Sequence, residues 1–196
     1  MILWINGAFG SGKTTSAYEL HRRLPQSFVY DPENIGYFLF KNMPTRLRLN
    51  DFQDYPQWRL FNYEMLKELA AGHEGVILAP MTVTNPQYFD EIIGRLRREG
   101  IEVKHYILYA ERATLEKRLN KRLQRGETWA KAQIDRCLHA FNHDIPDEKI
   151  ITDHLSIDAV VQEIAARSGL TLTPDNRSAL KKWTDRIRTL IRHIRR

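Results

Sequence analysis

"GAFGSGKT", residues 7–14, is the stretch that decides the fold. It fits the pattern Gly-x-x-x-x-Gly-Lys-Ser/Thr, whose fixed positions are Gly7, Gly12, Lys13 and Thr14. An apolar segment typical of a buried strand, residues 1–6, precedes it, and a helical pattern over 13–24 follows. A phosphate-binding loop requires this context, because glycines allow backbone geometries that point successive amide groups at one anion. The alternative is a glycine-rich turn that binds nothing, and the flanking strand and helix disfavour it.

The loop predicts a site for ATP with Mg²⁺. Lys13 is expected to bridge the terminal phosphates, the Thr14 hydroxyl to bind the metal, and the following helix to add its positive N-terminal end. The residues expected to hold the nucleotide are Gly7, Ala8, Phe9, Gly10, Ser11, Gly12, Lys13, Thr14 and Thr15. The loop alone leaves open whether the protein is a kinase, a hydrolase or a switch.

Strand-like and helical segments alternate along the chain. Apolar runs predict strands at 1–6, 27–30, 75–80, 103–109 and 149–152. This alternation predicts an α/β fold, a doubly wound parallel five-stranded sheet of the P-loop NTPase type with helices on both faces. The expected organisation is a kinase-like domain over 1–174, with a lid near 123–132, and an added basic amphipathic helix over 175–196.

The composition and the absence of two motifs narrow the class of nucleotide-binding protein. Apolar residues make up 42% of the chain and charged residues 28%, as is ordinary for a globular protein. The single cysteine, Cys137, excludes an intrachain disulfide and fits a reducing cytoplasm. The run "GVILAPMT" (75–82) ends without the aspartate that motors and GTPases place there, and no Asn-Lys-x-Asp occurs. In a chain this small, these features favour the nucleoside and small-molecule kinases over motors and switches.

Two acids near the second predicted strand are candidates for the acceptor side. Asp31 directly follows that strand, at the carboxyl edge where ligands gather in open α/β sheets. Its carboxylate could deprotonate an acceptor hydroxyl or bind the metal, and it could also cap the next helix. Glu33 is the alternative acid and a candidate contact of the substrate.

Arginines in the stretch 115–136 are candidates for a lid. Arg118 and Arg122 lie four residues apart on one helix face, and Arg125 precedes a candidate hinge at Gly126. Arg122 and Arg125 are expected to offset charge on the transferred phosphoryl group, and Arg118 to contact the nucleotide. A solvated basic helix surface is the alternative interpretation.

Aromatic residues are dense between the second and third predicted strands. Most are expected in the core, and some of them predict an apolar acceptor site with a few polar anchors. The candidate substrate contacts in this segment are Tyr55, Trp58, Arg59 and Tyr63.

The C-terminal segment carries the charge of the chain. Residues 175–196 hold eight Lys and Arg and two Asp, which accounts for the whole net charge of +6. An apolar stripe at helical spacing runs along it through Leu180, Trp183, Ile187, Leu190, Ile191 and Ile194. Packing of the stripe on the domain, peripheral contact with an anionic membrane and RNA contact are the alternatives.

With these motifs assembled, the chain resembles the bacterial tunicamycin-resistance ATP-binding proteins. The resemblance runs through "WINGAFGSGKT", "VYDPENIG", "DFQDYPQWRLFNY", "PMTVTNPQYFDEIIGRLR", "QIDRC" and the C-terminal helix. More distantly, the chain is similar to P-loop antibiotic and sugar kinases such as chloramphenicol phosphotransferase and gluconate kinase. In those kinases an aspartate after the second strand serves as base, and Asp31 stands at that position.

The resemblance implies ATP and Mg²⁺ as cofactors and tunicamycin, or a related nucleoside, as the small-molecule partner. Three functions stay open: phosphorylation of a tunicamycin hydroxyl, sequestration of the drug without chemistry, and ordinary nucleoside or nucleotide phosphorylation. Lys13, Asp31, Arg122 and Arg125 are then the expected catalytic residues, and Thr14 and Asp31 the metal ligands. Thr82 is a weak substitute for the missing acid. We expect a cytoplasmic monomer or homodimer with no nucleic-acid partner, and contact with the inner face of the cell membrane is one of the alternatives for its C-terminal helix.

Overall fold

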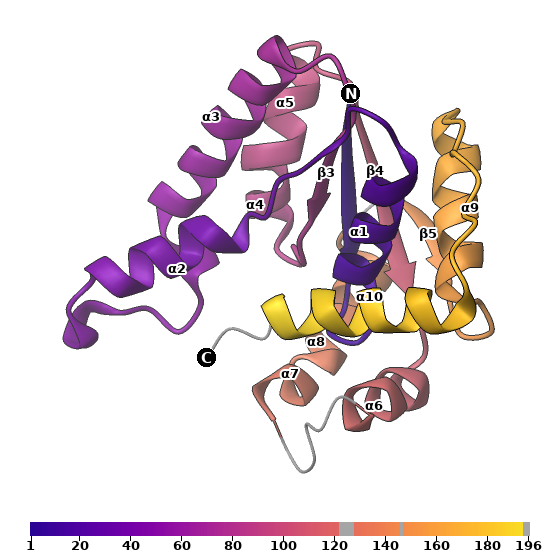
Figure 1. Ribbon diagram of the computed structural model, residues 1–196. Helices are drawn as coiled ribbons and strands as arrows, with labels where there is room; N and C mark the ends of the chain where they lie inside the picture. Colours follow the sequence, from indigo (N-terminus) through magenta and orange to yellow (C-terminus); the bar gives the residue numbers. More distant parts are fainter. Residues whose placement is uncertain (122–127, 146, 194–196) are drawn as a thin grey trace.

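A five-stranded parallel sheet in the order β2-β3-β1-β4-β5 runs through the computed structural model (Figure 1), which describes residues 1–121, 128–145 and 147–193. The strands are β1 (Ile2–Gly7), β2 (Phe28–Val29), β3 (Ile77–Pro80), β4 (Val103–Tyr109) and β5 (Glu148–Ile151). β1 is central: its Trp4 lies opposite Ala79 of β3 on one side and His105 of β4 on the other. The parallel pairing and the strand order confirm the predicted doubly wound α/β class.

Helices connect the strands and cover both faces of the sheet. Their bounds are α1 (Lys13–Arg23), α2 (Glu33–Asn42), α3 (Pro56–Gly72), α4 (Pro86–Phe89), α5 (Arg95–Arg98), α6 (Arg112–Asn120), α7 (Trp129–Ala132), α8 (Ile134–His143), α9 (Ile157–Ser168) and α10 (Ala179–His193). Short 3₁₀ turns, η1 (Thr45–Leu47) and η2 (Phe52–Asp54), lie between α2 and α3. A π-helical turn, η3 (Asp90–Gly94), joins α4 to α5 into one run that starts after Asn85.

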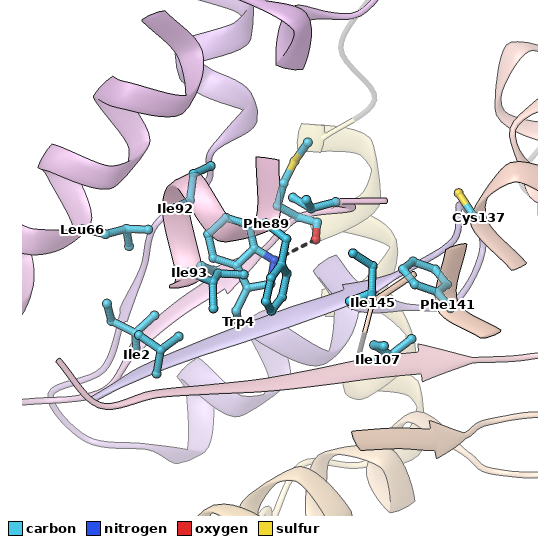
Figure 2. Packing of buried hydrophobic residues seen from close by; sticks show 14 of the residues in the cluster. Ile2, Trp4, Leu66, Phe89, Ile92, Ile93, Ile107, Cys137, Phe141 and Ile145 are labelled. Carbon is cyan, nitrogen blue, oxygen red and sulfur yellow. Dashed lines mark hydrogen bonds between the residues drawn. The ribbon is translucent and has the colours of Figure 1, made fainter. Parts of the chain in front are cut away.

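Side chains alternate along β1 and divide the core into two layers. Ile2 and Trp4 pack against α3, the α4–α5 run and α8, whereas Leu3 and Ile5 pack against α1 and α9. Figure 2 shows the first layer, in which the Trp4 indole donates to the carbonyl of Met81 at 3.1 Å. The complete burial of Ile2–Ile5 explains the unbroken apolar sequence of this part of β1.

The structure has a helix, α10, within the C-terminal segment 175–196, and it packs against α1 (Figure 1). Glu19 of α1, with a side chain only 1% exposed, forms ion pairs with Arg22, Arg177 and Arg186. Asp185 and Thr189 are buried on α10, whereas Leu180 and Trp183 are 70% and 60% exposed. These two members of the apolar stripe therefore point away from the domain. The described helices include none with the length and apolar character needed to cross a membrane.

Candidate active site

The glycine loop turns sharply at the carboxyl end of β1. Gly7, Gly10 and Gly12 have φ angles of 145°, 87° and 101°, a region that side-chain-bearing residues rarely adopt. A Cβ at Gly7 would lie 2.6 Å from the carbonyl oxygen of Leu108, so only glycine fits there. The loop thereby keeps its backbone close to the sheet and leaves a cradle above it.

The start of α1 supplies the positive side of this cradle. α1 begins at Lys13 immediately after the left-handed Gly12, and the first N–H groups of a helix have no acceptor within it. The Lys13 ammonium donates to the carbonyl of Ala8 at 3.2 Å and lies 5.4 Å from the centre of the Phe9 ring. The amine is thus held over the loop, and these groups fit the phosphates of a nucleotide.

A cavity of about 400 Å³ opens directly against the loop. The loop and α1 contribute Phe9, Gly10, Gly12, Lys13, Thr14 and Tyr18 to its lining. The segment from β2 to α3 contributes Asp31, Glu33, Tyr37, Asp51, Phe52 and Gln53, and the other lining residues are Pro80, Met81, Thr82, Leu119, Thr128, Trp129 and Ala130. The structure thus brings together the predicted residues Lys13, Thr14, Asp31 and Glu33. Hydroxyl and carboxylate oxygens are the ligands that Mg²⁺ prefers, so Thr14 and Asp31 fit the metal as well.

Asp31 reaches the cavity while it also fixes the start of α2. Its Oδ1 accepts from the backbone N–H of Glu33 at 3.0 Å. Glu33 in turn accepts from the Tyr37 hydroxyl at 2.9 Å, one turn further along the helix. This bond places the Asp31 carboxylate at the cavity, two residues after the end of β2.

The other four predicted substrate contacts do not line the cavity. Tyr55, Trp58 and Tyr63 are buried, and their polar atoms bond to the carbonyl of Leu47, the carbonyl of Pro32 and Glu99, respectively. Arg59 is buried in an ion pair with Glu91 and stacks on Tyr88 at 4.2 Å. The structure corrects their expected position: they support the acceptor side from behind, because α3 turns this face toward η2 and the α4–α5 run.

The predicted lid arginines have different outcomes. Arg118 lies on α6 and donates to the hydroxyl and the carbonyl of Thr152, at 3.0 and 2.6 Å, just after β5. Burial lowers the pKa of its guanidinium, and nearby Asp153 opposes that shift. Arg118 does not line the cavity. Arg122 and Arg125 lie outside the described residues, as does the first half of the predicted lid.

The segment after β3 is tied to the root of the loop. The Thr82 hydroxyl donates to the carbonyl of Gly7 at 2.8 Å, and the side chain of Asn6 bonds to both backbone groups of Val83. Thr82 therefore lines the cavity while its hydroxyl is engaged with the loop backbone.

Sequence reasoning missed several cavity residues. Asp51, Phe52 and Gln53 come from η2, where the Asp51 carboxylate caps the turn by accepting from the N–H of Gln53 at 3.0 Å. The Asp-x-x-Asp spacing in "NDFQDYP" was the available signal for such a turn. Trp129 of α7 packs edge-on against Phe9 of the loop at 5.0 Å, a contact that no local pattern indicates.

Comparisons with known proteins agree with this geometry. The model of a family described as AAA domain matches residues 2–143. The tunicamycin resistance protein of Deinococcus radiodurans is similar to the chain at 29% identity and a TM-score of 0.74, over 89% of this chain and 99% of that one. No curated protein sequence matches the chain significantly.

Two kinases share the fold at lower identity. The APS kinase of Mycobacterium tuberculosis is 19% identical, with a TM-score of 0.59 over 86% of this chain and 96% of its own. The shikimate kinase of Bacteroides thetaiotaomicron is also 19% identical, with a TM-score of 0.59 over 87% and 99%. The resemblance to tunicamycin-resistance proteins and to small P-loop kinases is thereby confirmed.

Proposed function

We propose that this chain transfers the terminal phosphoryl group of ATP to a hydroxyl of tunicamycin. The chain belongs to the AAA domain family and carries a P-loop at the carboxyl end of β1 in a kinase-like fold. One observation carries the proposal: Lys13 and Thr14 line the same cavity as Asp31. A phosphate donor and an acceptor hydroxyl could therefore meet between the loop and a carboxylate. The similarity to the Deinococcus radiodurans tunicamycin resistance protein supports tunicamycin as the acceptor.

The reaction assigns a role to each of these groups. The loop amides and Lys13 bind the phosphates, and Thr14 and Asp31 would hold Mg²⁺, which neutralises charge on the phosphates when bound. Asp31 accepts the proton of the acceptor hydroxyl as its oxygen forms a bond to the terminal phosphorus. The bond between that phosphorus and the bridging oxygen breaks, and ADP leaves. In this proposal Arg122 and Arg125 offset the developing charge, and Arg118 supports the nucleotide end from Thr152.

The charge of the cavity supports an uncharged acceptor. Among the described lining residues, Asp31, Glu33 and Asp51 are acidic and Lys13 is the single cation. An acceptor that carries a phosphate or carboxylate would meet these like charges, of which Asp51 is paired with Arg136 at 3.6 Å, and this disfavours nucleoside monophosphates. Tunicamycin is an acylated, uridine-containing nucleoside with several sugar hydroxyls. Tyr37, Gln53 and the carboxylates could bind such hydroxyls, with Phe52 and Trp129 as apolar surface.

Mass spectrometry of tunicamycin after incubation with the protein and Mg-ATP tests the proposal. We expect one added phosphate, and we expect Asp31→Asn to reduce the rate about 10²- to 10⁴-fold, the usual contribution of a general base. Asp90→Asn, at an exposed aspartate paired with Arg98, is the matched control and should retain the rate. Drug binding by folded protein without any added phosphate would refute transfer and favour sequestration.

We also propose that α10 holds the protein against the inner, anionic face of the cell membrane, from the cytoplasmic side. Leu180 and Trp183 are exposed on the side of α10 opposite the buried Asp185 and Thr189. Lys181 and Arg188 are exposed beside them. An apolar strip flanked by basic residues suits an anionic lipid surface, where each basic residue contributes about 1 kcal/mol.

A further inference from the structure

A buried polar chain runs from the root of the glycine loop to the far side of β4, and nothing in the proposed reaction uses it. Its members are Asn6 at the end of β1, His105 in β4 and Asp147 before β5. Asn6 is fully buried and His105 is 3% exposed. Buried polar groups destabilise a core unless they are fully paired, so their arrangement can be solved from their hydrogen bonds.

Every hydrogen-bonding position of the Asn6 amide is occupied. Its Oδ1 accepts from the N–H of Gly7 at 2.8 Å and from the N–H of Val83 at 3.0 Å. Its Nδ2 donates to the carbonyl of Val83 at 2.8 Å and lies 3.0 Å from Nε2 of His105. Asn6 therefore joins the first amide of the loop to the segment that carries Thr82. An amide flip would break the three bonds to Gly7 and Val83.

The orientation of Asn6 decides the protonation state of His105. Because Nδ2 of Asn6 is a donor, Nε2 of His105 has to be the acceptor, so the imidazole proton lies on Nδ1. Nδ1–H donates a hydrogen bond to the Asp147 carboxylate at 3.0 Å, and the same carboxylate pairs with Arg97 at 3.2 Å. Phe89 packs edge-on against the ring at 5.0 Å. The neutral Nδ1–H imidazole is the one form that satisfies all of these partners.

We propose that Asn6 is a positioning residue for the phosphate-binding loop, and that neutral His105, held by Asp147, fixes its orientation and makes nucleotide binding sensitive to acid. A second proton on His105 would place Nε2–H against the Nδ2–H of Asn6, two donors at 3.0 Å. Either the imidazole has to turn away or the amide has to flip. A flip of the amide releases the N–H of Gly7 and both backbone groups of Val83, whereas a turn of the imidazole takes the acceptor away from Nδ2 of Asn6 and with it the contact that fixes the amide.

The charges around His105 set the pH range in which nucleotide affinity is expected to fall. Burial lowers the pKa of its imidazole, Asp147 opposes that shift, and Arg97 adds to it. The folded protein therefore binds this proton only below the ordinary histidine value of about 6.5. Burial raises the pKa of Asp147, but hydrogen bonds from His105 and Arg97 outweigh it, so the carboxylate stays charged as the acceptor. Nucleotide affinity is expected to fall in the acid range and to be constant above neutrality.

The inference rests on the nucleotide half of the proposed function and can be tested without tunicamycin. Calorimetric titration of the full chain with a Mg-bound, non-hydrolysable ATP analogue, from pH 7.5 to 5, measures it directly. The side chain of His105→Gln can accept from Asn6 and cannot gain a proton, so this variant should bind like wild type at pH 7.5. Below the His105 pKa, the wild-type affinity should fall relative to this variant by up to about tenfold per pH unit. Titration of the nucleotide itself cancels in this ratio.

Three variants complete the test. His139→Gln, at an exposed histidine on α8, should follow the wild-type curve. Asn6→Ala should weaken binding at every pH. If His105→Gln does not fold, Asp147→Asn decides, because removal of the carboxylate should move the loss of affinity to lower pH. Identical pH curves for wild type and His105→Gln, or an unshifted curve for Asp147→Asn, would overturn the proposal. Absence of phosphate transfer to tunicamycin would leave it intact.

Discussion

Glu19→Gln isolates the charged contact that fastens α10 to the domain. The side chain of Glu19 is 1% exposed and pairs with Arg22 at 3.0 Å, with Arg186 at 3.4 Å and with Arg177. Glutamine keeps the size of the side chain and removes its charge. Loss of a carboxylate from a buried ion pair costs about 3–5 kcal/mol when it leaves an uncompensated buried charge.

The other contacts of the arginines that pair with Glu19 reduce the expected loss of stability. Arg177 also pairs with Asp175 at 2.8 Å and Asp185 at 3.0 Å, and Arg186 also pairs with Asp158 at 2.8 Å. The Arg22 side chain is 28% exposed and can regain water. No arginine is therefore left without a partner, and the cost falls to the loss of charge-assisted hydrogen bonds, about 2–3 kcal/mol.

Urea unfolding followed by circular dichroism measures the change in the free energy of unfolding. Glu148→Gln is the matched control, because Glu148 is 63% exposed in its pair with Arg167 and should contribute less than about 1 kcal/mol. Limited trypsin digestion reports on the helix itself, and Glu19→Gln should speed cleavage within α10. A change of less than about 0.5 kcal/mol in Glu19→Gln would refute the view that this cluster holds α10 in place.

Three further predictions follow from the site and from α10. Lys13→Ala should weaken Mg-ATP binding about 10- to 100-fold in calorimetry, because a charge-assisted contact to phosphate is lost, and unchanged affinity would contradict the phosphate site. The double variant Leu180→Ser/Trp183→Ser should reduce co-sedimentation with anionic liposomes at least about tenfold. The control Phe38→Ser, at a 57% exposed position on α2, should not reduce it. Equal loss in both variants would contradict a specific membrane-binding face on α10. Arg177 lowers the pKa of Asp175 well below its ordinary value although burial opposes it, so the stabilisation is present above about pH 4 and is lost as the pH falls further. A free energy of unfolding, measured with urea and circular dichroism, that does not fall between pH 5 and 2.5 would contradict this linkage.

Local patterns were sufficient to predict most of the fold. The apolar runs, the glycine loop and the helix that follows it each depend on neighbouring residues, so the sequence contains their signal directly. The bulge at Asp90–Gly94 was not predictable, because a π-helical turn changes one hydrogen bond and leaves the apolar spacing nearly intact.

The acceptor side was harder to predict, because it depends on which face of α3 meets the domain. Arg59 and Tyr63 were expected to line the cavity, yet Arg59 pairs with Glu91 and Tyr63 with Glu99, 32 and 36 residues away. Such partners appear only when α3 and the α4–α5 run are placed side by side. The charged docking of α10 was missed for the same reason, since its carboxylate partner Glu19 lies in α1.

The segment after β3 shows why Asp31 carries more weight in this protein than a capping residue usually does. Motors and GTPases place an acid there for the metal, whereas Met81, Thr82 and Val83 use their polar groups to hold β1 and its loop. Under the proposed function, Asp31 then serves both the metal and the acceptor proton. Asp31→Asn should therefore raise the Mg²⁺ concentration needed for half-maximal transfer as well as lower the maximal rate. A lowered rate with an unchanged Mg²⁺ requirement would assign Asp31 to the proton alone.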